Sequence, residues 1–238
     1  INLLGIDSSE SIEAIISVEG KAEGDHYLFF STKLGTVKKT PVSEFSNIRT
    51  NGLKAIGLKD GDQLINVTLT TGNENIIIGT HLGYSVSFDE KVVRSMGRSA
   101  AGVRGIRLRD DDYVVGMDIL HPDSEVLVIT EKGYGKRTHA SEYAIKGRGG
   151  KGIKTVNITE RNGTLAGLTT VTGSEDIMLI TNKGVIIRFD IESVSQTGRA
   201  TQGVRLIRLE EDAIVSTMAK VAKEEDPEIE ETTEEIKS

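Results

Sequence analysis

The sequence predicts an all-β fold assembled from repeated units of about 50 residues, each with roughly four short strands and no helix. A turn motif with the pattern T-x-x-G occurs four times, and its successive glycines lie 48, 50 and 51 residues apart. Apolar runs rich in β-branched residues flank each copy. Farther along every unit, apolar and other residues alternate, which is typical of half-buried strands.

The four turn motifs predict four hairpins. Each follows an apolar run and precedes a second one, such as Val185–Phe189. A strand, a tight turn that contains glycine and another strand together indicate a β-hairpin. The motifs are Thr32–Gly35, Thr80–Gly83, Thr130–Gly133 and Thr181–Gly184, and the runs before them are Tyr27–Phe30, Ile76–Ile78, Val126–Ile129 and Ile177–Ile180.

A second glycine follows the first by 17 residues in the first unit and by 19 in the others. Beyond it comes an alternating segment, which we expect to be a half-buried strand. An acidic turn such as Asp110–Asp112 and another apolar run complete the unit. The second glycines are Gly52, Gly102, Gly152 and Gly203, and the alternating pairs are Ile56 and Leu58, Ile106 and Leu108, Val156 and Ile158, and Ile207 and Leu209.

These repeats predict one domain over residues 1–222. Units of this length with four strands each are typical of a propeller-like array, in which each blade buries its faces on its neighbours. Separate sandwiches are disfavoured, because so short a unit buries too little core alone. We place the units roughly at 26–70, 75–120, 125–171 and 176–222, with the trailing half of an earlier unit at 1–20 and an acidic, disordered tail at 223–238.

The net charge of −7 is concentrated in this tail. Residues 223–238 carry eight acidic and two basic side chains, which leaves 28 acidic and 27 basic side chains in residues 1–222. A near-neutral body is compatible with a polyanionic ligand if its bases are grouped. The chain has no cysteine and no long apolar run, so we expect a cytoplasmic protein without disulfides and without membrane contact.

Basic residues recur at equivalent places in the units, which predicts a basic rim. Contacts between such a rim and phosphates would position DNA without reading its sequence. Two residues beyond the second glycine stand Lys54, Arg104, Lys154 and Arg205; four residues before it stand Arg98, Arg148 and Arg199, with Arg49 one place along in the first unit; three or four residues beyond the first glycine stand Lys38, Lys39, Lys136, Arg137 and Arg188.

The densest basic segment is Lys146–Gly152, with the sequence KGRGGKG. Its glycines allow a close approach of the backbone to a phosphate, and Lys146, Arg148 and Lys151 supply charge. A flexible surface loop without a ligand is the alternative. The segment also has the pattern G-x-G-x-x-G, but the β-branched residues that follow it are not the helix that a dinucleotide site requires.

No catalytic constellation is present in the sequence. The histidines are scattered singly and lack metal-ligand spacing. Asp110–Asp112 lacks the remaining ligands of a calcium loop, so we expect a strand-connecting turn. No Walker A motif occurs, which places any ATP chemistry outside this chain. We therefore expect no enzymatic activity and no cofactor in this chain alone.

The repeated hairpins and three further segments resemble the C-terminal domain of bacterial DNA gyrase A, in the version found in Gram-positive bacteria. The segments are TEKGYGKR at 130–137, RGGKGIKT at 148–155 and GVRLIRL at 203–209. The resemblance spans residues 1–222. It implies a β-pinwheel, a propeller variant whose blades exchange strands, and it implies that the fifteen bases named above bind duplex DNA.

The resemblance also implies a function within a larger enzyme. Members of the family wrap DNA around a basic perimeter and thereby support negative supercoiling by an A₂B₂ complex with gyrase B. ATP and Mg²⁺ act only in that holoenzyme, in the cytoplasm at the nucleoid.

Two departures qualify this resemblance. The family's Q-R-R-G-G-K/R-G box is matched only approximately at 146–152, where Lys146 and Gly147 replace its first two residues. Four full units are present, which implies a partial pinwheel without the first blades and their box. Two alternatives stay open: the corresponding C-terminal domain of topoisomerase IV, and a propeller-like scaffold that binds proteins rather than DNA.

Overall fold

The computed structural model describes residue 12 and residues 14–18, 25–46 and 52–223. Within these residues the chain forms fifteen strands, four short 3₁₀ turns and no α-helix, so the predicted all-β class is confirmed. Most of the predicted half unit at 1–20, Arg49 and the tail beyond Lys223 lie outside the described residues.

The first two units supply the first seven strands. The first unit holds β1 (Tyr27–Thr32), β2 (Thr36–Pro41), the 3₁₀ turn η1 (Val42–Phe45) and β3 (Leu64–Thr70). The second unit holds β4 (Asn75–Thr80), β5 (Tyr84–Asp89), η2 (Glu90–Val92), β6 (Val103–Arg104) and β7 (Val114–Ile119).

The last two units repeat this order. The third unit holds β8 (Glu125–Thr130), β9 (Tyr134–His139), η3 (Ala140–Glu142), β10 (Ile153–Lys154) and β11 (Leu165–Val171). The fourth unit holds β12 (Glu175–Thr181), β13 (Ile186–Asp190), η4 (Ile191–Ser193), β14 (Val204–Arg205) and β15 (Val215–Ala222).

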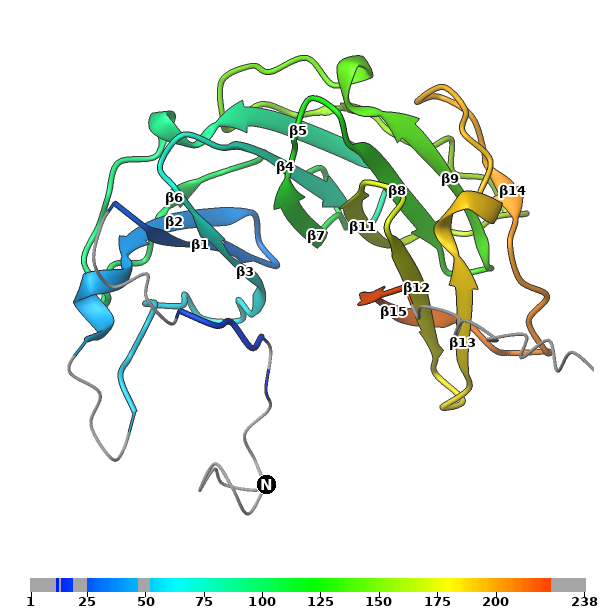
Figure 1. Cartoon of the computed structure of the whole chain (residues 1–238), viewed down its shortest axis with the longest axis horizontal. Helices are drawn as coiled ribbons and strands as arrows, with labels where there is room; N and C mark the ends of the chain where they lie inside the picture. Colours follow the sequence, from blue (N-terminus) through cyan, green and yellow to red (C-terminus); the bar gives the residue numbers. More distant parts are fainter. Residues whose placement is uncertain (1–11, 13, 19–24, 47–51, 224–238) are drawn as a thin grey trace, which may run out of the picture.

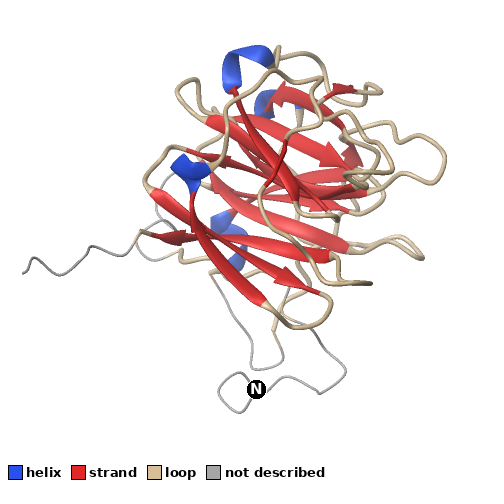
Figure 2. Cartoon of the chain, turned by 90° about the vertical axis from the view of Figure 1, so that its right-hand side faces the viewer, coloured by secondary structure: helices blue, strands red, loops and turns tan. Residues whose placement is uncertain are grey.

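Consecutive units exchange strands. In the first sheet the order is β3-β1-β2-β6, so β6 of the second unit completes a sheet whose other strands belong to the first. β10 and β14 complete the second and third sheets in the same way, and the described part of the fourth sheet has the order β13-β12-β15. The four sheets follow one another around an arc (Figure 1) and lie one above another when the molecule is turned (Figure 2). The described residues therefore form a four-bladed pinwheel.

The second glycine of a unit makes this exchange possible. Gly102 has a φ of 96°, and a Cβ added to it would lie 2.4 Å from the carbonyl oxygen of Val37 in the preceding blade. Gly203 stands in the same relation to Gly135, at 2.6 Å. Any other residue would combine a strained backbone with a clash against backbone atoms.

The strands expected at the alternating segments are absent in the described residues, and this prediction was wrong. Residues 105–109 carry no strand. Ile106 instead lies under the turn of the preceding unit, where Gly105 N and Ile106 N donate to Gly35 O at 2.8 and 3.3 Å. The apolar side chains alternate because the segment is extended and packs one of its sides against a turn. It does not pair with a strand.

Side chains that bind the backbone explain the T-x-x-G motif. Thr32 Oγ1 accepts a hydrogen bond from Thr36 N and donates one to Asp62 Oδ2 at 2.7 Å, while Asp62 Oδ1 accepts one from Leu34 N. In the second unit Asp112 accepts from Leu82 N at 2.9 Å. The acidic turns thus fix the neighbouring hairpin turns through hydrogen bonds.

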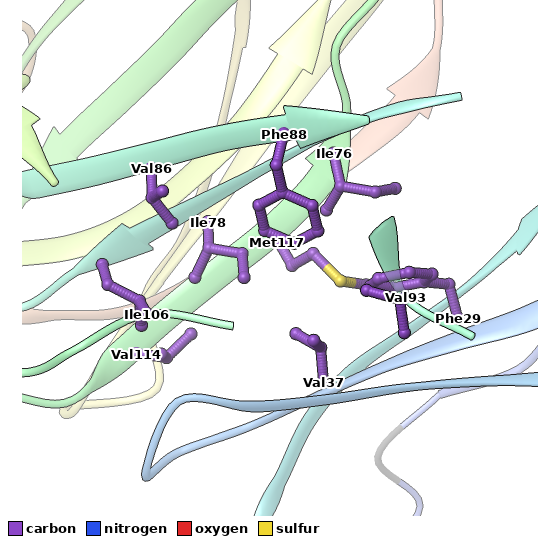
Figure 3. Packing of buried hydrophobic residues seen from close by; sticks show 10 residues of the cluster. All are labelled: Phe29, Val37, Ile76, Ile78, Val86, Phe88, Val93, Ile106, Val114 and Met117. Carbon is purple, nitrogen blue, oxygen red and sulfur yellow. The ribbon is translucent and has the colours of Figure 1, made fainter. Parts of the chain in front are cut away.

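One apolar cluster fills each interface between consecutive sheets. Between the first two sheets, Phe29 and Val37 pack against Ile76, Ile78 and Phe88 (Figure 3). Ile77 lies between Ile76 and Ile78 in the sequence but points to the other face of the sheet. It belongs to the next cluster, between the second and third sheets. Because successive side chains of a strand point to opposite faces, a sheet covered on both faces needs an uninterrupted apolar run.

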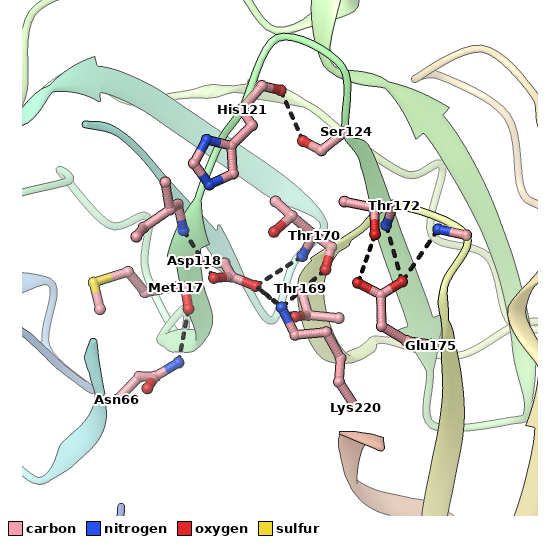
Figure 4. Close-up of polar contacts among 12 residues, drawn as sticks. Asn66, Met117, Asp118, His121, Ser124, Thr169, Thr170, Thr172, Glu175 and Lys220 are labelled. Carbon is pink, nitrogen blue, oxygen red and sulfur yellow. Dashed lines mark hydrogen bonds and ion pairs between the residues drawn. The ribbon is translucent and has the colours of Figure 1, made fainter. Parts of the chain in front are cut away.

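A polar cluster joins three units through their innermost strands (Figure 4). Asp118 Oδ2 in β7 accepts hydrogen bonds from Thr169 Oγ1 at 2.6 Å and Thr170 N at 2.9 Å, both in β11. Lys220 Nζ in β15 lies 2.9 Å from the same oxygen. Burial acts to raise the pKa of Asp118, but Lys220 and these hydrogen bonds together hold it below its usual value.

Candidate nucleic-acid interface

The bases predicted to bind DNA are carried mainly by three straps, at 93–104, 143–154 and 194–205. Each strap follows a 3₁₀ turn and ends in the two-residue strand that completes the preceding sheet. Equivalent backbone hydrogen bonds fix all three on the second strand of that sheet. The donors and acceptors are Met96 N and Lys39 O, Lys146 N and Ser87 O, and Thr197 N and Arg137 O, at 2.8 to 2.9 Å.

The bases two residues beyond the second glycine are exposed. Arg104, Lys154 and Arg205 are the last residues of β6, β10 and β14, the outermost strands of three consecutive sheets. Lys54 is exposed at the equivalent place in the first unit, where the described residues contain no such strand. These four bases therefore occupy matching places in successive units and are available to a ligand.

The arginines four residues before the second glycine bind the backbone. Arg148 Nη1 donates to Arg104 O at 3.0 Å, and Arg199 Nη1 donates to Lys154 O at 2.8 Å. Each of these guanidinium groups thus holds the backbone of an exposed base in the preceding unit. Arg98, at the equivalent place in the second unit, is half-buried.

Two predicted bases are fully buried. Lys38 Nζ donates to Ala55 O and to Arg98 O, and Lys136 Nζ donates to Gly198 O at 2.6 Å and to Arg199 O. Burial lowers the pKa of each lysine to about 8. Both ammonium groups hold a turn of the following strap and are closed to a ligand.

Three further predicted bases pair with carboxylates. Lys39 is almost fully buried and lies 3.7 Å from Glu90. Arg137 Nη1 lies 2.6 Å from Glu125 Oε2, and Arg188 Nε lies 2.7 Å from Asp176 Oδ2. The charges of Arg137 and Arg188 are compensated by carboxylates of their own units, and that of Lys39 by Glu90 in η2 of the next unit.

The glycine-rich segment Lys146–Gly152 forms an exposed turn of the second strap. Gly149 N donates to Gly105 O at 2.6 Å, and Arg109 Nη1 donates to Lys151 O at 2.6 Å. The side chains of Lys146 and Lys151 are exposed. The turn is therefore fixed at its backbone and presents its lysines to solvent.

Sequence reasoning missed two arginines that lie beside tyrosines. The guanidinium carbon of Arg109 lies 3.3 Å from the ring centroid of Tyr84, and Arg161 Nε donates to Tyr134 Oη at 2.9 Å. Tyr84 and Tyr134 both follow the first glycine of their unit, which was a usable signal. Their arginine partners stand at different distances from the second glycine, so the repeat pattern could not reveal them.

Features of other site classes are absent from the described part of the chain. It holds no group of three or more His, Asp or Glu residues arranged to bind a metal ion. None of its helices has the length and apolar character needed to cross a membrane.

The family model for "DNA gyrase C-terminal domain, beta-propeller" matches residues 26–71, 74–121, 124–172 and 175–222. The chain belongs to this family. The four matches follow the four described units, and each of the first three sheets takes its last strand from the next match. The predicted resemblance to the C-terminal domain of gyrase A is confirmed.

Curated relatives agree with this family. DNA gyrase A of Streptococcus pyogenes serotype M1 is 66% identical over 225 residues, which cover 94% of this chain and 27% of the relative. DNA gyrase A of Staphylococcus epidermidis is 53% identical over 228 residues, which cover 95% of this chain and 26% of the relative. The chain thus spans about a quarter of the length of these gyrase proteins.

Solved structures share the fold. The crystal structure of the C-terminal domain of DNA topoisomerase IV matches with a TM-score of 0.86 and 30% identity, covering 93% of this chain and 69% of that one. The structure of a DNA gyrase A C-terminal domain matches with a TM-score of 0.81 and 23% identity, covering 92% and 73%.

Proposed function

We propose that this gyrase-family domain binds duplex DNA without sequence preference and wraps it along the outer strands of its blades. The observation that carries the proposal is the equivalent, exposed position of Arg104, Lys154 and Arg205 at the ends of three successive outermost strands. Lys54 extends the series to the first unit. A series of bases that follows an arc fits a bent polyanion with regularly spaced charges.

The straps support this proposal because they hold the bases in fixed places. Backbone hydrogen bonds fasten each strap to the preceding blade, and Arg148 and Arg199 bind the carbonyl groups of Arg104 and Lys154. Because the backbone that carries these bases is already fixed, binding of a phosphate has to order only their side chains. The exposed lysines of the glycine-rich turn, Lys146 and Lys151, extend the proposed interface between the blades.

We further propose that the chain acts as a non-catalytic part of DNA gyrase, a type II topoisomerase of the bacterial cytoplasm. The proposed partners are the rest of gyrase A, gyrase B and DNA, and ATP and Mg²⁺ belong to the other domains. Support comes from the curated relatives, which carry the name DNA gyrase A. Wrapping by this domain would supply the handedness of negative supercoiling.

Salt-dependent binding tests the proposed interface. Fluorescence anisotropy with a short duplex should give a log Kd that is linear in log salt, with a slope of about 0.9 for each phosphate neutralised. Changing Lys54, Arg104, Lys154 and Arg205 together to Glu should weaken binding and flatten the line.

The matched control changes four exposed bases outside the straps, Lys59, Lys91, Lys183 and Lys223, to Glu. It alters the net charge equally and should cost much less affinity. Equal losses in the two variants would show that net charge, not the proposed interface, determines binding. Absence of DNA binding by the unaltered chain would favour a protein-binding scaffold.

A part of topoisomerase IV is the second candidate, because the topoisomerase IV domain gives a TM-score of 0.86. The identity of 66% to gyrase A favours gyrase. Chiral wrapping of DNA, measured as a change in the linking number of a closed circle, tests the wrapping that the gyrase resemblance implies.

A further inference from the structure

Two guanidinium groups converge on one phenol oxygen at the junction of the third and fourth units. Arg161 Nε lies 2.9 Å from Tyr134 Oη, and Arg205 approaches the same atom with Nε at 3.2 Å and Nη2 at 2.9 Å. Tyr134 begins β9 and its ring is buried, Arg161 stands in the turn before β11, and Arg205 ends β14. Three segments, distant in sequence, thus build one cluster.

The cluster gathers positive charge without a bonded counter-charge. No described carboxylate forms an ion pair with Arg161 or Arg205. The two positive guanidinium groups share one neutral oxygen and repel each other, and an anion bound between them would relieve this repulsion. The hydrogen bond from Arg161 is the main cause that lowers the pKa of Tyr134 below its ordinary value; burial opposes it, and the hydrogen bonds from Arg205 add to it, so this place favours negative charge.

A cavity of about 460 Å³ opens at the cluster. Lys132 and Arg208 also line it, and Glu210 and Asp212 are its two acidic side chains, so bases outnumber acids by four to two. The phenol accepts hydrogen bonds from the arginines and keeps its own O–H to donate. Guanidinium N–H groups not used on the phenol complete a set of donors that suits a tetrahedral oxyanion.

We propose that Tyr134, Arg161 and Arg205 form a pocket for a phosphate group, which we expect to be a backbone phosphate of bound duplex DNA. The DNA source rests on the proposed function, whereas the phosphate chemistry rests on the cluster alone. The pocket is particular to the third blade. At the equivalent Tyr84, Arg109 stacks on the ring and donates to Lys151 O, and the equivalent residues of the first and fourth units are Thr36 and Val185.

A charge-neutral substitution provides the sharpest test with DNA. Tyr134→Phe keeps the buried ring and removes the shared oxygen, so affinity for a short duplex should fall roughly 10- to 100-fold, as for the loss of a hydrogen bond to a charged group. Tyr84→Phe is the matched control, because no arginine bonds to that phenol among the described residues, and it should leave affinity unchanged. Arg161→Gln should reduce the salt slope by about 0.9, for one phosphate.

Inorganic phosphate tests the pocket separately from DNA. NMR spectra of the arginine Nε–Hε groups should show Arg161 and Arg205 shifting together as phosphate is added, and Tyr134→Phe should reduce these shifts. Shifts without any effect of Tyr134→Phe on DNA affinity would assign the pocket to a free phosphate. The pocket is refuted if Tyr134→Phe and Arg161→Gln leave DNA affinity and the salt slope as Tyr84→Phe does, and Tyr134→Phe leaves the phosphate-induced shifts unchanged. If the unaltered chain still binds DNA in that case, the proposed function stands. If the unaltered chain binds no DNA, the proposed function fails, and the phosphate shifts alone decide the pocket.

Discussion

At the scale of the residue, the sequence shows where charge lies along the chain but not where a side chain points. Lys38 and Arg104 both recur at fixed distances from a glycine, yet Lys38 is fully buried and Arg104 is exposed. Straps of the following unit pair with an edge of β2 and of β9 and bring carbonyl oxygens to the two buried lysines. A buried ammonium group is stable only if carbonyl oxygens inside the protein accept its hydrogen bonds, and the local sequence does not predict where such oxygens lie.

The buried lysines predict a rise of stability with pH. Burial lowers the pKa of Lys136 to about 8, whereas the unfolded chain keeps this proton until about pH 10.4. Between these values the unfolded state binds more protons, so the free energy of unfolding increases with pH, by roughly 1–3 kcal/mol for each buried lysine. Urea unfolding measured from pH 7.5 to 10.5 should show this increase, and Lys136→Met should remove about half of it. Identical pH slopes in the two proteins would contradict the assignment.

Asp118 predicts an effect with the opposite direction in pH. Its pKa is lowered in the folded state, so its contribution is present above about pH 4 and is lost as the pH falls through the folded value. Lys220→Met removes the ammonium group and should destabilise the protein by about 1–2 kcal/mol at pH 7. This difference from the unaltered chain should shrink at pH 3. A difference that is the same at both pH values would show that Lys220 acts through packing alone.

At the scale of the element, the hairpins could be predicted because strand, turn and strand follow one another directly along the chain. The exchanged strands β6, β10 and β14 have two residues each and carry no periodic signal of their own. Their positions depend on a carbonyl group of another blade, such as that of Val37 beside Gly102. The repeat indicated that each unit has a second glycine at a fixed place. Only the three-dimensional structure shows which atoms of the neighbouring blade this glycine approaches.

A glycine series tests the fastening of the straps. Gly102→Ala adds a Cβ 2.4 Å from Val37 O at a φ of 96°, so we expect a loss of about 2–4 kcal/mol in the free energy of unfolding. Gly61→Ala carries only the cost of a φ of 75°, about 1 kcal/mol, because no atom lies near its Cβ. Gly97→Ala in the same strap has open space and should be neutral. Urea unfolding that ranks Gly102→Ala with Gly97→Ala would refute the close approach.

At the scale of the whole molecule, the repeat predicted the class, the number of described blades and the hairpin that begins each unit. The apolar runs were enough to predict the sheets, because a sheet that is covered on both faces needs uninterrupted apolar runs, and this requirement does not depend on the ligand. The candidate interface was predictable only in part. Exposed bases such as Lys154 follow the repeat, whereas the Tyr134 pocket combines a turn of one unit with a strand of the next and has no counterpart in the other blades.

Chiral wrapping is the central claim, and the linking number of closed DNA tests it most directly. The chain is bound to a nicked circular plasmid, the nick is ligated, the protein is removed and the topoisomers are separated on a gel. We expect the topoisomer distribution to shift in one direction, and to shift further as more chain is added. The variant with Glu at positions 54, 104, 154 and 205 should abolish the shift, and the four-site control should retain it. A distribution centred where it lies without protein, under conditions in which the chain is bound, would contradict the account.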